Sequence, residues 1–96
     1  MRILGHDFTV RLSREPAQLL EWDGQLVYET QEIVIGSEMP RSRQISALLH
    51  EILHAVAKFQ GVALTETDTQ ALEVGLLDTL IGAGVDLSPL MEGLRR

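Results

Sequence analysis

His50, Glu51 and His54 form an HExxH pattern, and these are the residues of the chain whose types and spacing are best suited to chemistry. On an α-helix, residues four apart differ by about 40° around the axis and about 6 Å along it, so both imidazoles can reach one cation. Glu51 lies too far round the helix to share that ion, but it can take a proton from a metal-activated water. The spacing predicts a zinc site with His50 and His54 as ligands and Glu51 as the general base.

The chain between Pro40 and Gln60 has the apolar periodicity of the helix that this motif needs. Large apolar residues recur there at spacings of three and four: Ile45, Leu48, Leu49, Ile52, Leu53, Val56 and Phe59. At about 100° per residue, His50 and His54 fall nearly opposite the centre of this stripe, beside Ser46 and other small residues. We therefore expect the histidines to face away from the core, with room for a second element to approach them.

A second helix is predicted directly after the motif helix. Gly61 is typical of a helix end, and Thr65 can cap a new helix that extends to about Ile81, with Asp68 completing a capping box. Ser88-Pro89 can then begin a short terminal helix that extends through Leu94.

A catalytic zinc site needs a third protein ligand, which the second helix can supply. Glu66 and Glu73 are seven residues apart and project onto its expected apolar face, formed by Leu72, Leu76, Leu77 and Leu80. A tight antiparallel helix pair favours Glu73, whereas a steep crossing or an early end of the first helix favours Glu66. Both glutamates are therefore candidate ligands.

The N-terminal third predicts a small antiparallel sheet. Residues 2–12 mix apolar and polar positions as a half-buried strand does, and Gly5-His6-Asp7 can bend it. Residues 13–18 are expected to form a loop or a short helical turn, and residues 25–35 two strands joined by a short polar turn. Phe8, Trp22, Tyr28 and Phe59 are expected in the core. The fold expected is α+β: an N-terminal antiparallel sheet packed on the HExxH helix, then a second helix and a short C-terminal one.

The composition of the chain argues against several classes of protein. A chain of 96 residues predicts one domain, 1–96, and a net charge of −6 with scattered basic residues argues against nucleic-acid binding. Because there is no cysteine, a metal has to be held by His, Asp or Glu. The chain shows neither a signal peptide nor an apolar run of membrane-spanning length, which predicts a cytoplasmic protein without a membrane partner.

Several stretches of the chain resemble the zincin metallopeptidases, and more narrowly the small phage- and prophage-associated members of the ImmA/IrrE metallopeptidase family. The likeness covers most of the chain and is carried by YETQEIVI at 28–35, LLHEILHA at 48–55, LTE at 64–66, AL at 71–72 and GLL at 75–77. It implies zinc held by His50, His54 and an acid of the next helix, Glu51 as base, and cleavage of peptide bonds, often in a regulatory protein. Gln70 departs from the pattern, since similar chains often carry Glu there.

The function expected is that of a zinc-dependent metallopeptidase, a hydrolase whose partner is a peptide or protein substrate. An extended substrate could add as a strand to the edge of the 25–35 hairpin. The alternative is a catalytically inactive zincin-like accessory or interaction domain, whose strand edge would bind a protein partner or a second copy of the chain.

Overall fold

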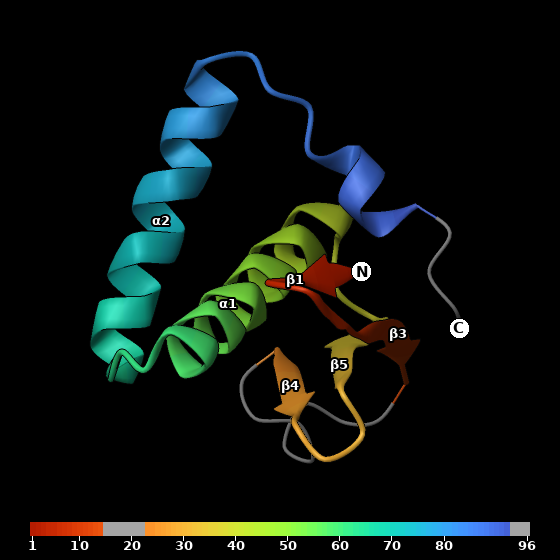
Figure 1. The fold of residues 1–96 in the computed structure, drawn as a ribbon. Coiled ribbons are helices and arrows are strands. Elements are labelled where there is room, and N and C mark those ends of the chain that lie inside the picture. The colour runs from red at the N-terminus through yellow and green to blue at the C-terminus, as the bar shows by residue number, and fades with distance from the viewer. Residues whose placement is uncertain (15–22, 93–96) are drawn as a thin grey trace.

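The computed structural model describes residues 1–14 and 23–92, in which short strands come first and helices follow (Figure 1). The elements are β1 (Arg2–Ile3), β2 (His6–Asp7), β3 (Thr9–Ser13), β4 (Gly24–Val27), β5 (Glu32–Gly36), α1 (Arg41–Gln60), α2 (Glu66–Gly82) and the 3-10 helix η2 (Ser88–Met91). The expected α+β fold, with strands packed on the HExxH helix, is confirmed.

Residues 2–12 were predicted as one half-buried strand but contain β1, β2 and most of β3. Leu4 and Gly5 both adopt positive φ angles, of 49° and 82°, as a two-residue hairpin turn requires, so the segment folds back as β1 and β2 before β3 begins. The hairpin predicted at 25–35 is confirmed as β4 and β5, which pair antiparallel.

The main sheet is mixed, and not purely antiparallel as expected. Its order is β3-β5-β4, and β3 runs parallel to β5, with Val10 opposite Ile33. β5 is therefore the central strand and is buried at Ile33, Val34 and Ile35. This arrangement leaves β4 at one edge of the sheet, on the side where it also contacts α1.

The core lies between this sheet and α1. Its buried members include Phe8, Val10, Leu12, Ile33, Ile35, Leu48, Ala55 and Met91, and Met91 brings η2 back onto α1. Phe59 packs against this cluster, as predicted, whereas Tyr28 is 36% exposed and lies outside it. Of the loop predicted at 13–18, Ser13 belongs instead to β3, and residues 15–18 lie outside the described residues, as does Trp22. The terminal helix predicted from Ser88 to Leu94 is a 3-10 helix that ends at Met91, after which Glu92 is extended.

The buried side of α1 is rotated around the helix relative to the predicted apolar stripe. Ile45, Ile52 and Val56 pack against the core, but Leu49 and Leu53 do not belong to it. The helix instead buries Gln44, Ala47, Glu51 and Ala55, because the sheet covers that flank of α1. One consequence is that Glu51 is enclosed within the structure.

The turn between α1 and α2 follows the predicted signals. Gly61 adopts a left-handed φ of 70°, which glycine tolerates well, and the amide of Val62 donates to the carbonyl of Ala57 at 2.8 Å. Thr65 and Asp68 form the predicted capping box. From this turn the two helices diverge, as Figure 1 shows.

The expected apolar face of α2 is not covered. Leu72 and Leu76 are 45% and 41% exposed, and Leu77 and Leu80 are half-buried. Of the residues of α2, all of which the structure describes, Thr69 is the one that is buried. α2 therefore meets α1 through a largely polar face. None of the helices in the described part of the chain combines the length and apolar character needed to cross a bilayer.

Candidate metal centre

The first turn of α2 brings a carboxylate against both motif histidines. Glu66 Oε2 lies 3.0 Å from His50 Nε2, and Glu66 Oε1 lies 2.8 Å from His54 Nε2. The three residues offer one ligand atom each, all within 4.8 Å of one another. The structure thus gathers His50, His54 and Glu66 into one group that could hold a metal ion.

This donor set fits zinc in kind and in spacing. Two imidazole nitrogens and one carboxylate oxygen form a known ligand set of catalytic zinc sites, which leave a fourth position open. With bonds of 2.0–2.1 Å and tetrahedral angles, zinc ligand atoms lie about 3.3 Å apart, close to the contacts seen here. Glu66 has 49% of its side chain exposed, so the group opens toward solvent on the α2 side.

Glu73 contacts the same histidine through its other nitrogen. Its Oε1 lies 2.9 Å from His50 Nδ1, while Oε2 accepts a hydrogen bond from the Ser46 hydroxyl. The Glu73 side chain is only 13% exposed. A carboxylate that accepts from Nδ1–H holds the ring orientation and directs the Nε2 lone pair toward a metal. Glu73 is therefore placed to orient His50, and Glu66 is placed beside both ligand nitrogens.

Two carboxylates contact the same imidazole ring, that of His50. A neutral imidazole carries one N–H, so His50 can donate to only one of Glu66 and Glu73. If Nδ1 donates to Glu73, the lone pair of Nε2 faces a Glu66 oxygen 3.0 Å away. A metal ion between Nε2 and Glu66 would be bound by both of these acceptors.

The register between the helices explains which glutamate lies where. The expectation for a tight antiparallel pair placed Glu73 opposite both histidines, but Glu73 lies opposite Ser46 and His50, about one helical turn further along. Glu66 is the first residue of α2 and takes the place beside His50 and His54. The short turn after Gly61 starts α2 beside the end of α1, and the two helices diverge from there (Figure 1).

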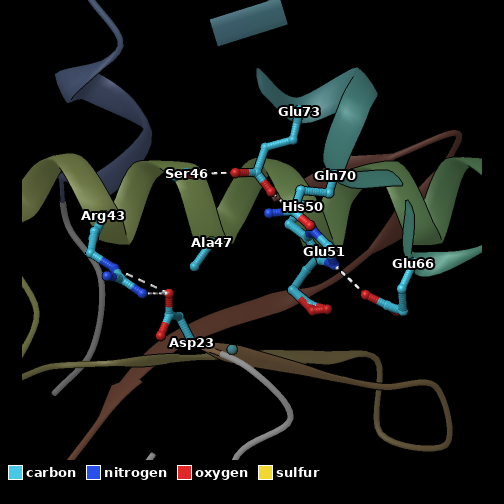
Figure 2. Close-up of a pocket in the computed structure, with 10 residues that line it drawn as sticks. Asp23, Arg43, Ser46, Ala47, His50, Glu51, Glu66, Gln70 and Glu73 are labelled. Carbon is cyan, nitrogen blue, oxygen red and sulfur yellow. Dashed lines mark hydrogen bonds and ion pairs between the residues drawn. The ribbon is translucent and has the colours of Figure 1, made fainter. Parts of the chain in front are cut away.

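Glu51 lines a pocket together with His50 and Glu66. The pocket has a volume of about 450 Å³ and is lined by Asp23, Gly24, Arg43, Ser46, Ala47, His50, Glu51, Glu66, Gln70 and Glu73. Figure 2 shows Glu51 between α1 and the sheet, below His50. Glu51 is 7% exposed, and a Cβ on Gly24 would come within 3.6 Å of its Cγ. A Cβ there would come closer to β5, at 3.0 Å from Ile35 Cδ1 and 3.1 Å from the Val34 carbonyl oxygen, so the packing against β5 is what favours glycine at this position.

Tyr28, which was expected in the core, lies instead beside the site. Its hydroxyl donates to the backbone carbonyl of His54 at 3.4 Å. Partial burial raises the pKa of Tyr28, and the negative charge of Glu51 raises it further. No periodicity in the sequence relates position 28 to position 54, because the contact arises only when the β4–β5 turn lies against α1.

An ion pair lies at the other end of the pocket. Arg43 donates to Asp23 from both Nε and Nη2, as Figure 2 shows. Arg43 precedes His50 by seven residues, about 10 Å along the helix, and neither member of the pair carried a signal in the sequence. The pocket thus extends from the histidine and glutamate group to a charged pair on the opposite side.

Comparison with known proteins identifies no relative. No protein-family model, no curated protein and no solved structure matches this chain.

Proposed function

We propose that this protein is a zinc-dependent metallopeptidase in which His50, His54 and Glu66 bind the metal and Glu51 is the general base. The observation that carries the proposal is the position of Glu66, whose two oxygens lie 3.0 and 2.8 Å from the Nε2 atoms of the HExxH histidines. An HExxH helix with a third acidic ligand and a carboxylate in the adjoining pocket has the parts required for metal-assisted hydrolysis.

Each residue of the site would have a separate role in the hydrolysis. Bound zinc would supply a Lewis acid that polarises a carbonyl and lowers the pKa of water. Glu51, enclosed beside the group, would accept the proton of the attacking water and pass it to the leaving amine. Glu73 would hold His50 through Nδ1, with Ser46 holding Glu73 in turn.

The edge strand β4 supports a peptide as the substrate. β4 lies at the edge of the three-stranded sheet, and its first residue, Gly24, lines the pocket. An extended peptide paired with this edge would run past Glu51 while its backbone hydrogen bonds are satisfied. This arrangement would position a scissile bond within the pocket.

Metal analysis tests the proposal. We expect wild-type protein purified without added zinc to carry about one zinc per chain. The variant Glu51→Gln should retain that zinc but lose cleavage of an unstructured peptide library by at least about 100-fold, because it removes only the proton acceptor. Near-zero occupancy at neutral pH would reject the enzyme, and so would full activity in Glu51→Gln.

The alternative is a catalytically inactive accessory or interaction domain with the same scaffold. The exposed apolar side chains of α2, such as Leu72 and Val74, favour this reading because such surfaces commonly bind proteins. It predicts a folded wild-type protein that lacks peptidase activity even when fully loaded with zinc.

A further inference from the structure

Gln70 lies on the face of α2 that carries the two glutamates in contact with His50. It follows Glu66 by four residues and precedes Glu73 by three, so the three side chains fall within about 60° of one another around the helix. Gln70 lines the pocket together with these residues. Figure 2 shows it between Glu73 and Glu66, extending from α2 toward α1. The amide of Gln70 therefore belongs to the wall that α2 contributes to the pocket.

The side-chain amide of Gln70 is not engaged by the protein. Within the described part of the chain it makes no hydrogen bond, and the residue is exposed. By contrast, the Ser46 hydroxyl donates to Glu73, and the Arg43 guanidinium donates to Asp23. A glutamine amide is neutral and carries two N–H donors. Those of Gln70 are available to a group that enters the pocket.

Hydrolysis of a peptide bond creates a need for such a donor at the carbonyl oxygen of the substrate. When water adds, its oxygen bonds to the carbonyl carbon, Glu51 takes a proton from the water, and the C=O π pair moves onto the carbonyl oxygen. When the C–N bond breaks, that pair re-forms C=O, the bonding pair stays on nitrogen, and Glu51 returns the proton to nitrogen. The oxygen is negative only between these two steps, and a fixed N–H aimed at it favours that state.

We propose that the Nε2–H of Gln70 donates a hydrogen bond to this substrate oxygen, which makes Gln70 a catalytic residue. The inference rests on the proposed metallopeptidase function. Glu66 and Gln70 are one helical turn apart, about 6 Å along α2, so an oxygen held next to Glu66 and His50 lies within reach of a flexible glutamine side chain. The ionised carboxylates around the metal group have no hydrogen to donate.

Two other donors close to the pocket are less well placed. Arg43 lies about 10 Å from His50 along α1, and its guanidinium holds Asp23. The Tyr28 hydroxyl donates to the backbone carbonyl of His54, and Tyr28 is not among the described residues that line the pocket.

Phosphate binding tests this role without turnover. Inorganic phosphate is tetrahedral and anionic, as the substrate is after water has added, and the visible absorption of cobalt(II) exchanged for zinc reports its binding. Gln70→Met keeps the length of the side chain but removes its donors. We expect it to raise the dissociation constant of phosphate by at least about fivefold, because hydrogen bonds to charged groups are the stronger ones. Gln60→Met, the same exchange at an exposed position of α1 outside the pocket, should bind phosphate as the wild type does.

Kinetics on a cleaved peptide test the timing of the contact. Gln70→Met should lower kcat by at least about tenfold and change KM by less than about twofold, since the oxygen becomes negative only after water has added. Its zinc affinity and its unfolding midpoint in urea should equal those of the wild type, because Gln70 is exposed and is not a proposed ligand. A merely structural role would instead lower the unfolding midpoint together with kcat.

Metal content is measured first, because it separates the two proposals. A wild-type protein without metal rejects the enzyme and this role with it. In metal-loaded protein, equal phosphate dissociation constants or equal kcat values for the wild type and Gln70→Met would overturn the role of Gln70 and leave the metallopeptidase standing. Loss of zinc from Gln70→Met would overturn it as well, since the amide would then act on the metal group and not on the substrate.

Discussion

His50 contacts two carboxylates through different ring nitrogens, and the two contacts have different consequences for metal binding. Glu66 meets the nitrogen that would face a metal, whereas Glu73 meets the nitrogen that sets the ring orientation. Removing a direct ligand abolishes most affinity, but removing an orienting carboxylate typically weakens metal affinity by only 10–100-fold.

The two glutamates should therefore differ in a metal titration. We expect Glu66→Ala to lose stoichiometric zinc, and Glu73→Ala to bind zinc with an affinity lowered by about 10–100-fold. Competition against a chromophoric chelator measures both. Asp78→Ala is the matched control on α2 and should bind as the wild type does. Equal loss of zinc in the two glutamate variants would place Glu73 among the ligands.

Tyr28 reports on the position of Glu51. Burial and the Glu51 charge raise the pKa of this phenol above its usual value of 10.0. Since the folded-state pKa is the raised one, the resulting stability is present below about pH 10 and is lost as the pH rises through the folded value. Tyr28 is the one tyrosine in the chain, so its absorbance can be titrated without interference.

In chelator-treated protein, Glu51→Gln should lower the pKa of Tyr28 toward, but not to, its usual value. The charge contribution disappears while burial, the larger cause, remains. An unchanged titration curve would show that the Glu51 carboxylate does not lie near the phenol in solution.

At the scale of elements, the start of α2 matters most because Glu66 is its first residue. The capping box fixes this start: the Asp68 amide donates to Thr65 Oγ1 at 3.0 Å, and the Thr65 amide donates to the Asp68 carboxylate. With a single buried residue, α2 has little other packing to hold its first turn in place. The cap therefore supports both helix stability and the geometry of the site.

Thr65→Ala should lower the free energy of unfolding of metal-free protein by about 1 kcal/mol, as loss of a helix cap usually does. Urea denaturation followed by circular dichroism measures this change. We also expect weaker zinc binding, because the turn that carries Glu66 frays. Thr67→Ala, at an exposed position of the same turn, should show neither effect. If Thr65→Ala is as stable as Thr67→Ala, the cap does not hold the helix start.

At the scale of the whole molecule, the core is formed by the sheet, α1 and η2, and α2 joins this body mainly through polar contacts with α1. A metal held by His50, His54 and Glu66 would tie α2 to α1 across that contact. Because the site needs both helices in place, binding would favour the folded state.

Zinc should accordingly stabilise the protein against heat. At a free zinc concentration 100 times the dissociation constant, one site adds about 2.7 kcal/mol to the free energy of unfolding. For a domain of this size that corresponds to a rise in Tm of roughly 10–20 °C. Calorimetry with zinc and with chelator measures the shift. His54→Ala should remove it, and a wild-type Tm that does not respond to zinc would contradict a metal site.

Much of the local structure was predictable from residue patterns. The HExxH helix, its end at Gly61, the capping box at Thr65 and the 25–35 hairpin follow from short-range periodicity and from residues with strong conformational preferences. The parallel pairing of β3 with β5 was not predictable in this way, because alternation along a strand says nothing about the direction of its neighbour.

The amino-acid pattern alone was enough to place His50 and His54 on one side of a helix with small neighbours, because angles within a helix depend only on residue number. The tertiary structure was needed to place Glu66 beside both histidines and Glu73 behind His50. That assignment depends on the relative register and divergence of two helices, which the turn after Gly61 and side-chain packing determine together. The same packing leaves the outer face of α2 uncovered, because the polar side of this helix is the one that the histidines engage.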